Sequence, residues 1–401
     1  MTQNSRSDPA LPYPFGCADR LEVDDAYGAL RQQETMARVR LPFGEDAWLA
    51  TRYPDVKAVL GDPRFSRAAT VGRDEPRVTQ QQLGTGILSM DPPDHTRLRR
   101  PVLRAFTARR VELLRPATVA TANELIDRME SIGPPVDLVE HFATPLPVRV
   151  ICGLLGVPVG DQDLFRIWSE AFISSTSFSP EKIQEYIGNL YAYISGLIAQ
   201  RRVTPSDDLL TAMVQAHDDR EEITEQEMVE LAAGLLAAGH ETTVLQISNF
   251  MYVLMRHPAE MEKMTGDPSL IPSAVEELLR FVPLFASSTF ARYATEDVRL
   301  GGTLVRAGDP VVPSLTSANR DPSVFTDPDR LDVTRAANPH FGFGHGAHHC
   351  IGARLARMEL QVSLETLLTR LPNLRLAAGD DQELWKEGLI LRGMKSMPVT
   401  W

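Results

Sequence analysis

The chain has 401 residues, of which 43% are hydrophobic and 23% charged, a composition typical of a globular protein with a large core. Its formal net charge of −12 at pH 7 argues against nucleic acid as a partner, because phosphates need a basic face. The polar N-terminus indicates no signal peptide, and no window of about 18 uninterrupted apolar residues predicts a membrane helix.

Three cysteines, Cys17, Cys152 and Cys350, are too few to form a disulfide framework. Cys152 lies in the apolar stretch V-R-V-I-C-G-L-L and is predicted to be a small buried hydrophobic residue, whereas Cys17 lies in a polar N-terminal segment. Sparse free cysteines indicate a reducing compartment, so we expect a cytoplasmic protein.

The chain shows no internal repeat and no long linker, so we expect a single domain over residues 1–401, with an irregular segment at 1–20. Residues 37–42 and 47–53 are rich in strand-forming residues and flank the turn-forming residues 43–46. This pattern predicts a β-hairpin, the first regular structure of the chain.

The segment 91–100 predicts a short helix that carries cationic side chains. Asp94 follows two prolines and is expected to be its N-cap. His95 and Arg99 are four residues apart, so both should point the same way. Pro101 removes one backbone hydrogen bond and should bend this helix.

Helical periodicity of the apolar residues predicts further helices at 116–131, 180–201, 206–217 and 352–371. The longest helix is predicted to begin at the capping box 224–227 and to reach about residue 256, a length of roughly 50 Å. A helix so long and so apolar should cross the middle of the protein. Short strands are expected near 286–315 and 374–400, so the fold class is mainly α with minor β structure.

The long helix contains the polar interruption Ala238-Gly239-His240-Glu241-Thr242-Thr243. A threonine hydroxyl inside a helix can bond the carbonyl oxygen four residues back, which for Thr242 is that of Ala238, and so loosen the helix beside Gly239. The alternative interpretation is an ordinary polar stretch of a core helix.

The stretch Phe341–Gly352, F-G-F-G-H-G-A-H-H-C-I-G, carries the most informative chemistry of the chain. Glycines at 342, 344 and 346 allow the backbone to fold tightly and to approach a ligand closely. Cys350 directly precedes an apolar helix. The positive end of that helix and its N–H groups should lower the pKa of the thiol and suit it to be an anionic metal ligand.

Two other interpretations of this stretch are weaker. A zinc site would have to use His345, His348, His349 and Cys350, and four ligands within six residues cannot easily surround one ion. A nucleophilic cysteine activated by a nearby histidine would leave the glycines and the long helix unexplained.

Residues 343–352 resemble the heme-binding signature of cytochromes P-450, F-G-x-G-x-[HR]-x-C-x-G, at every position. The resemblance implies that Cys350 is the thiolate ligand of heme b, in a cofactor-binding loop that reaches Gly352. It also implies that His348 hydrogen-bonds a heme propionate and that Phe343 shields the sulfur from water. A thiolate ligand favours cleavage of the O–O bond.

The polar stretch of the long helix resembles the distal motif of the same family, [AG]-G-x-[DE]-T-[TS]. The resemblance implies that Ala238 lies beside the heme, that Thr242 hydrogen-bonds bound dioxygen and that Glu241 relays protons from solvent. Three basic residues match positions that bind the heme propionates in the family: His95, Arg99 and Arg292. Propionates are carboxylates, for which several cationic donors are suited.

Glu277-Leu278-Leu279-Arg280 places a carboxylate and a guanidinium on one helix face. This spacing is common by itself, but it resembles the E-x-x-R motif of the family. The resemblance implies that the pair joins Arg330, from Pro328-Asp329-Arg330, in a structural and not a catalytic cluster.

The resemblance extends over nearly the whole chain and implies the P-450 fold, a triangular helical prism with small β-sheets. Heme would lie between the 224–256 helix and the Cys350 loop. The sequence is most similar to actinobacterial members that tailor macrolides and polyketides. We therefore expect a monooxygenase that inserts one oxygen atom of O₂ into a hydrophobic small molecule, by hydroxylation or epoxidation.

The substrate pocket should be apolar, since an oil-like substrate must exclude water. By position it should include Gly86, Ile87, Leu88, Leu235, Ala238, Phe285, Ser287, Ile390 and Leu391. The hydroxyl-rich residues 174–177 lie between two predicted helices and suit either a mobile lid or a plain surface loop.

The chain carries no flavin or nicotinamide fingerprint, so electrons should come from a ferredoxin and its reductase. A basic patch near the thiolate would steer an acidic ferredoxin: Arg97, Arg100, Arg104, Arg109, Arg110 and Arg354. We expect a monomer, because no coiled coil is evident. The alternatives are a peroxide-dependent or non-redox heme-thiolate enzyme, and a heme-based sensor or ligand-binding protein.

Overall fold

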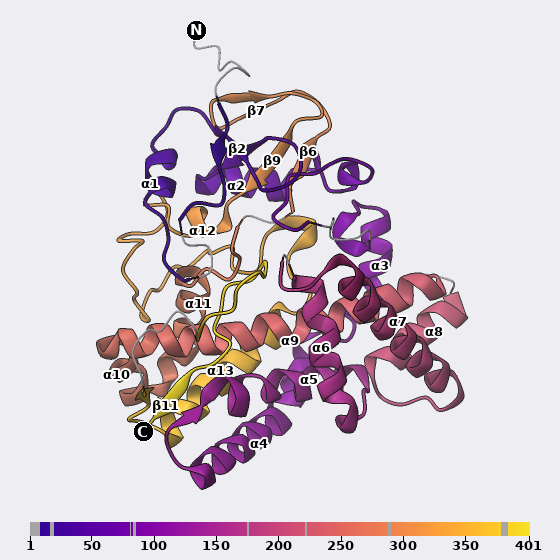
Figure 1. Ribbon diagram of the computed structural model, residues 1–401, viewed down its shortest axis with the longest axis vertical. Helices are drawn as coiled ribbons and strands as arrows, with labels where there is room; N and C mark the ends of the chain where they lie inside the picture. Colours follow the sequence, from indigo (N-terminus) through magenta and orange to yellow (C-terminus); the bar gives the residue numbers. More distant parts are fainter. Residues whose placement is uncertain are drawn as a thin grey trace.

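The computed structural model describes residues 9–16, 20–80, 82, 86–174, 176–220, 223–287, 290–377 and 384–401; Cys17 and Ser175 lie outside them. The part of the chain so described is mainly helical (Figure 1). Its α-helices are α1 Ala26–Arg31, α2 Tyr53–Gly61, α3 Asp94–Leu103, α4 Ala108–Ile132, α5 Pro145–Leu155, α6 Gln162–Ile173, α7 Pro180–Val203, α8 Leu209–Arg220, α9 Glu225–Arg256, α10 Pro258–Gly266, α11 Ile271–Phe281, α12 Leu315–Ala318 and α13 Ala353–Arg370. The expected fold class, mainly α with minor β, is confirmed.

The strands are short and gather at one side of the molecule and near the C-terminus (Figure 1). They are β1 Leu11–Pro12, β2 Ala37–Arg40, β3 Ala47–Ala50, β4 Phe65–Ser66, β5 Val136–Asp137, β6 Arg292–Ala294, β7 Val298–Leu300, β8 Thr303–Val305, β9 Pro310–Pro313, β10 Arg375–Leu376 and β11 Pro398–Thr400. Within the described residues they form sheets of order β1-β2-β3-β9-β6-β4, β10-β11-β5 and β7-β8.

The predicted hairpin is confirmed as β2 and β3, which pair antiparallel with Arg38 opposite Trp48. The segment 1–20 was expected to be irregular, but β1 lies within it. Leu11 and Pro12 pair in parallel with β2 at Val39 and Arg40. A two-residue strand at a sheet edge leaves no alternation pattern in the sequence, which explains why it was not predicted.

Helix α9 runs through the middle of the molecule, as its length and apolarity predicted (Figure 1). It begins with a true capping box, in which the Thr224 hydroxyl accepts from the Glu227 N–H and the Glu227 carboxylate accepts from the Thr224 N–H at 2.8 Å. Helices α5, α6, α7 and α13 pack around it. Buried side chains cover most of its length, so α9 is the axis on which the site is built.

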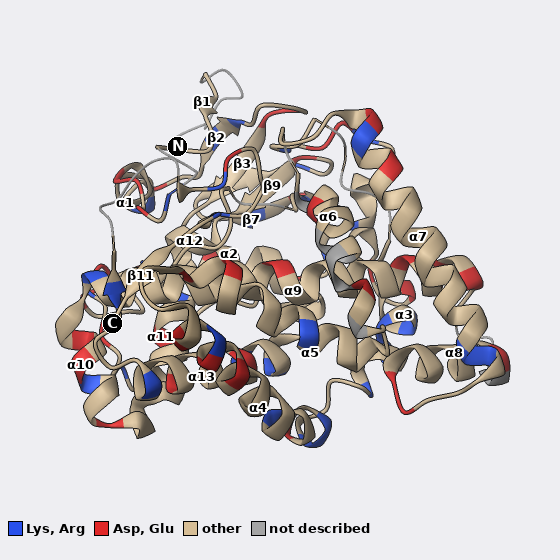
Figure 2. Ribbon diagram, turned by 60° about the horizontal axis from the view of Figure 1, so that its bottom comes forward, with Lys and Arg blue, Asp and Glu red and all other residues tan. Residues whose placement is uncertain are grey.

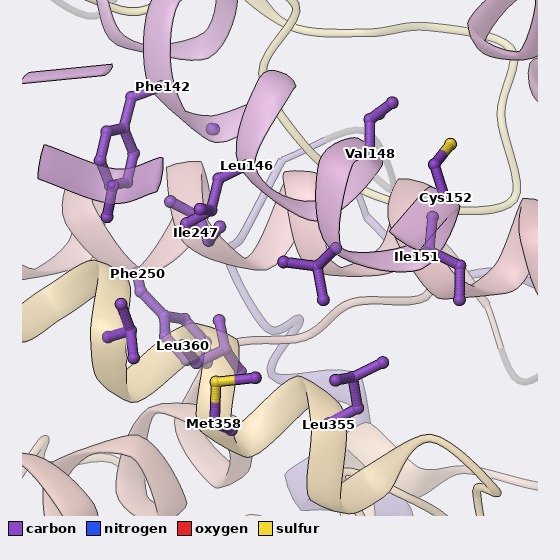
Figure 3. Packing of buried hydrophobic residues seen from close by; sticks show 14 of the residues in the cluster. Phe142, Leu146, Val148, Ile151, Cys152, Ile247, Phe250, Leu355, Met358 and Leu360 are labelled. Carbon is purple, nitrogen blue, oxygen red and sulfur yellow. The ribbon is translucent and has the colours of Figure 1, made fainter. Parts of the chain in front are cut away.

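Close packing between α5, α9 and α13 forms the main core (Figure 3). Ile151 and Cys152 of α5 are 1% exposed and belong to the same cluster as Phe250 of α9 and Met358 of α13. The prediction that Cys152 is a small buried hydrophobic residue is therefore confirmed. Burial also raises the pKa of its thiol to about 12, so this cysteine stays neutral.

Three helix starts differ from those predicted. Helix α8 begins at Leu209 and not at residue 206. Asp94 is the first residue of α3 and not its N-cap, because Pro93 already has helical φ and ψ of −86° and −20°. Helix α4 begins at Ala108, well before residue 116, and Thr107 caps it by accepting from the Arg110 N–H at 3.4 Å. Its first turns are strongly charged, so apolar periodicity does not reveal them.

Candidate functional site

The loop before α13 presents the Cys350 side chain. The Cys350 N–H donates to the Phe343 carbonyl at 2.9 Å and closes the loop, and α13 begins three residues later. Gly346 has a φ of +71°, and a Cβ there would collide with the Leu60 carbonyl of α2. The glycine therefore permits both the turn and the close approach to α2.

The Cys350 side chain is solvent-exposed, although protein atoms surround it closely, so it lines an internal space. Burial raises the pKa of its thiol, contrary to the lowered pKa that the sequence predicted. The stabilising groups that the prediction invoked are present: the N–H groups of Gly352 and Ala353 and the charges of Arg99 and Arg357 favour the thiolate. Desolvation acts against these groups, and a metal cation at the sulfur would add to them in favouring the thiolate, so the site fits a heme iron.

Beside this loop, basic groups from distant segments converge. The ring centroids of His95 on α3 and His348 are 4.3 Å apart, and Arg292 on β6 is 7% exposed. Burial, then the charges of Arg292, His95 and Arg67, lowers the pKa of His348 to about 3. The His348 Nε2 atom is buried and has no hydrogen-bond partner among the described residues. Bound carboxylates would satisfy this group and offset the mutual repulsion, so the cluster fits heme propionates.

Arg99 and Arg67 connect this cluster to its surroundings. Arg99 donates a hydrogen bond to the His349 carbonyl and so joins α3 to the cysteine loop. Arg67, which sequence reasoning missed, is 2% exposed and donates to the carbonyl oxygens of Leu88, at 2.9 Å, and Ala291. It also pairs with the Glu75 carboxylate at 3.2 Å. The two carbonyl partners lie on remote segments, and no local sequence pattern predicts those contacts.

On α9, the Thr242 hydroxyl donates to the Ala238 carbonyl at 2.7 Å, as expected. The expected loosening of the helix is absent, because α9 is continuous through this region. Gly239 has a different role: a Cβ there would lie 2.7 Å from the Ile151 side chain, so the glycine allows α5 to pack closely. Ala238 is exposed although its helix is otherwise mostly buried, so it also lines an internal space.

Glu241 is buried beside Thr242 and has two charged or titratable neighbours. Its carboxylate lies 3.4 Å from His240 Nε2 and 3.7 Å from Lys386 Nζ. Burial acts to raise the pKa of Glu241, but His240 and Lys386 outweigh it and hold this pKa at about 2. Lys386 was not predicted, because it lies in a C-terminal loop without a family motif.

The expected pocket residues come together in part. Phe285, Ile390 and Leu391 form a cluster with Leu245 of α9, which the sequence did not single out. The Phe285 and Leu391 backbones are bridged, and Arg392 donates to the Phe285 carbonyl at 2.9 Å. The backbone bridge and the Arg392 side chain therefore hold Phe285 beside Leu391.

The other expected pocket residues do not join that cluster. Ile87 and Leu235 pack partly buried against the main core, and the Leu88 side chain is 51% exposed beside Gly86. Ser287 is 5% exposed.

The residues 174–177 lie between α6 and α7, and the described members contact the C-terminal loop. Ser174 forms a backbone bridge with Leu389. The N–H groups of Thr176 and Ser177 donate to the Gly388 carbonyl at 2.9 and 3.2 Å. Thr176 and Ser177 are thus docked on the loop that leads into Ile390 and Leu391.

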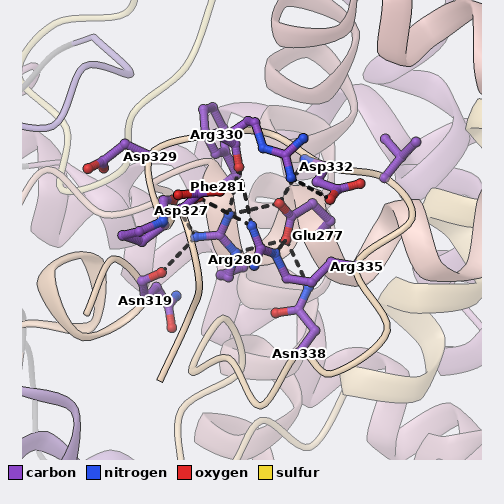
Figure 4. Close-up of polar contacts among 12 residues, drawn as sticks. Glu277, Arg280, Phe281, Asn319, Asp327, Asp329, Arg330, Asp332, Arg335 and Asn338 are labelled. Atoms are coloured by element: carbon purple, nitrogen blue, oxygen red, sulfur yellow. Dashed lines mark hydrogen bonds and ion pairs between the residues drawn. The ribbon is translucent and has the colours of Figure 1, made fainter. Parts of the chain in front are cut away.

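The E-x-x-R pair forms the buried polar cluster drawn in Figure 4. Glu277 and Arg280 are fully buried and joined by two hydrogen bonds of 2.8 Å. The expected third member, Arg330, contributes only its carbonyl oxygen, 3.3 Å from Arg280, while its side chain pairs with Asp332 near the surface. Besides Arg280, the guanidinium that contacts Glu277 is that of Arg335 and not that of Arg330, at a distance of 3.0 Å.

This correction has a local cause. The Arg330 N–H closes a turn on the Asp327 carbonyl at 3.1 Å, and Asp327 has a φ of +46°. The turn leaves the Arg330 side chain 61% exposed, whereas that of Arg335 is 10% exposed.

The expected basic patch is interspersed with acidic groups, as the alternation of blue and red on α4 and α13 illustrates (Figure 2). Arg97 is held by Glu227 at 2.6 Å and Arg110 lies 3.6 Å from Asp207. Four members of the patch are exposed and form no ion pair with an acidic group of the described residues: Arg100, Arg104, Arg109 and Arg354. Arg97 and Arg100 line a surface groove of about 520 Å³ with Pro92, Pro93 and Thr96.

The histidines of the cysteine loop diverge. His345 lies against Gly61 of α2, His348 against His95, and His349 near the Phe343 ring. In the described part of the chain, no group of three or more His, Cys, Asp and Glu side chains is arranged to hold a metal ion, which gives the zinc interpretation no support. Among the described helices, none combines the length and apolarity needed to cross a membrane.

Comparison with known proteins gives consistent matches. The family described as Cytochrome P450 matches residues 174–390. Mycinamicin IV hydroxylase/epoxidase of Micromonospora griseorubida is 53% identical over 389 residues, 97% of this chain and 98% of that protein. Nocardicin C N-oxygenase of Nocardia uniformis subsp. tsuyamanensis is 50% identical, with 97% of this chain and 98% of that protein covered. A solved structure of the mixed-function P450 MycG has a TM-score of 0.92 and 52% identity, covering 98% of this chain and all of that one.

Proposed function

The chain belongs to the cytochrome P450 family, and on that premise we propose that it is a heme-thiolate monooxygenase in which Cys350 is the axial ligand of the iron. Heme b is the cofactor of the family, bound through a cysteine thiolate, and it supplies the iron centre at which dioxygen is activated. One observation carries the assignment: the Cys350 thiol lines an internal space beside a buried cluster of basic side chains.

The proximal residues would hold the cofactor in complementary ways. The basic residues of the cluster bind the propionates: His95, Arg99, Arg292 and His348. The Phe343 ring, stacked 4.5 Å from the Arg357 guanidinium, helps to keep water from the sulfur. The N–H groups after Cys350, including that of Gly352, stabilise its negative charge.

The distal residues would handle protons. The Thr242 hydroxyl donates its hydrogen bond to the Ala238 carbonyl, so its oxygen is left to accept a hydrogen bond from a protonated group on the distal side. Glu241, the residue before Thr242, is a buried carboxylate and would relay protons from solvent. These two groups support oxygen activation over peroxide-dependent or sensor functions.

The substrate would be a hydrophobic natural product of macrolide or polyketide type, hydroxylated or epoxidised. Apolar walls would exclude water from it: Ile87, Leu88, Leu235, Ala238, Phe285, Ile390 and Leu391, with Ser287. One relative is named for hydroxylation and epoxidation of mycinamicin IV, and the other, almost as similar, for N-oxygenation of nocardicin C. The substrate class therefore rests on the first similarity together with the apolar wall.

We further propose that the whole chain is one cytoplasmic, monomeric catalytic domain that receives electrons from a ferredoxin. The exposed arginines on α3 and α4 would attract an acidic partner, although the net charge of the chain is −12.

The test is the spectrum of the dithionite-reduced protein with carbon monoxide. The wild type should give the strongly red-shifted Soret band of thiolate-ligated heme. The Cys350→Ser variant should lose this band, whereas the control Cys152→Ser should keep it. A wild-type band typical of imidazole ligation would overturn the assignment of Cys350.

A further inference from the structure

Glu241 is a buried carboxylate with an incomplete set of hydrogen bonds. Its side chain is 4% exposed, and Oε2 accepts no hydrogen bond from any residue that the structure describes. The Lys386 ammonium at 3.7 Å provides an ionic contact instead. A buried carboxylate without full hydrogen bonding depends strongly on such a charge.

Lys386 is held in place on the C-terminal hairpin, residues 384–394. Its N–H donates to the Gly393 carbonyl at 2.9 Å, and its neighbour Trp385 packs edge-on against Tyr252 of α9 at 5.2 Å. Its side chain is 19% exposed, so the ammonium bridges the buried carboxylate and the solvent side.

The other neighbour of Glu241 leads to α6. The His240 Nδ1 atom faces the Leu236 carbonyl at 2.9 Å and so carries a hydrogen. Its Nε2 atom lies 3.0 Å from the Ser169 hydroxyl of α6 and 3.4 Å from Glu241. The position of α6 therefore affects the histidine that faces the carboxylate.

Both connections lead to Thr176 and Ser177, which follow α6 and dock on the hairpin. The N–H groups of Thr176 and Ser177 bond the carbonyl of Gly388, two residues after Lys386. Gly388 has a φ of +68°, and a Cβ there would lie 2.6 Å from the Thr176 hydroxyl and 3.0 Å from the Ser177 nitrogen. Only glycine fits this docked arrangement.

We propose that Lys386 is a positioning residue for Glu241, and that docking of Thr176 and Ser177 on Gly388 holds it there. The proposal rests on the proton-relay role of Glu241 in the proposed function. An anion so well stabilised takes up a proton poorly, so relay through Glu241 requires its contact with Lys386 to loosen. Undocking of Thr176 and Ser177 from Gly388 would release the tip of the hairpin 384–394 and allow the contact between Lys386 and Glu241 to loosen.

The first experiment follows the protonation of Glu241 by difference infrared spectroscopy of the heme-loaded protein. The band of a protonated carboxyl is assigned by its loss in Glu241→Gln. The groups that act on this carboxylate are His240 and Lys386. In Lys386→Met the band should appear about one pH unit or more above its wild-type position, because a stabilising charge is removed. The matched control Lys386→Arg keeps the charge and should titrate like the wild type.

The docking step is tested with Gly388→Ala, which leaves Lys386 intact. Faster proteolysis between α6 and α7 would establish undocking, and the infrared band should then shift upward as in Lys386→Met. Ser177→Pro, which removes one of the two N–H donors, gives a second variant should Gly388→Ala fail to fold.

An unchanged titration in Lys386→Met would overturn the positioning role, and an unchanged titration in an undocked variant would overturn the coupling. Neither readout depends on turnover. Loss of the thiolate-type carbon monoxide band would instead contradict the assignment of Cys350.

Discussion

At the residue scale, Glu277 depends on two guanidinium groups, those of Arg280 and Arg335. Arg335→Ala would remove one charge-assisted hydrogen bond from a buried carboxylate that keeps Arg280 and Asn338, so it should lower the free energy of unfolding by about 1.5–3 kcal/mol. Arg330→Ala removes only an exposed pair with Asp332 and should cost about 0–1 kcal/mol. Urea denaturation of the heme-loaded variants, side by side, measures both.

One outcome of this measurement would contradict the assignment of Arg335 to the buried cluster. If Arg330→Ala destabilises the protein as much as Arg335→Ala, then the Arg330 side chain turns inward in solution and the cluster of Figure 4 is wrong.

Motif spacing identified Glu277 and Arg280 but chose the wrong third residue. Spacing in a loop does not determine which of two arginines turns inward, since this depends on the turn at Asp327. Lys386 and Arg67 were missed for a related reason. Their contacts are long-range, and a lysine or arginine in a loop usually faces solvent.

At the element scale, Arg97 on α3 and Glu227 at the start of α9 form a pH-dependent link. The hydrogen bond from Arg97 is the main cause that lowers the pKa of Glu227 to about 2. A depressed carboxylate pKa gives stability that is present above the unfolded value of about 4.3 and is lost as the pH falls towards 2. Glu227→Gln should therefore destabilise the protein at neutral pH, and the deficit should shrink in acid.

Urea unfolding from neutral pH down through the window between about pH 4.3 and 2 checks this link. Glutamine still suits the capping box, so the substitution isolates the ion pair. Glu230→Gln, one turn along α9, is the control, because its partner is the neutral Gln226. A deficit that stays constant with pH would argue against the link.

Elements with strong local signals were predicted well: the hairpin of β2 and β3 from its turn, and α9 from its capping box and apolar length. The residues expected to line the substrate pocket form one cluster only in part, and their role stays a prediction. Phe285 and Leu391 meet because Arg392 and backbone hydrogen bonds join segments far apart in the chain. No periodicity within either segment encodes that contact.

At the scale of the whole molecule, the proposed ferredoxin partner would be acidic, so this acidic chain would have to attract it through a local surface. Arg97 is bound to Glu227 and is not available, so the exposed arginines on and after α3 would carry the attraction. Arg100→Glu with Arg104→Glu should slow reduction by a ferredoxin roughly tenfold or more at low salt. The effect should fade with added salt, since the Debye length shortens to about 10 Å at 0.1 M.

Net charge alone must be separated from the position of the charges. The double variant Arg299→Glu with Arg375→Glu changes the net charge by the same amount. Arg299 lies on β7, and Arg375 lies on β10, which pairs with β11. In Figure 1, β7 and β11 both lie away from α3. Stopped-flow reduction of both double variants distinguishes the cases. Steering by the arginines of α3 predicts a large, salt-sensitive loss only in the first pair, because field strength falls with distance from the docking face. Equal losses would mean that the whole-molecule charge governs the encounter, and no loss in the first pair would place docking elsewhere.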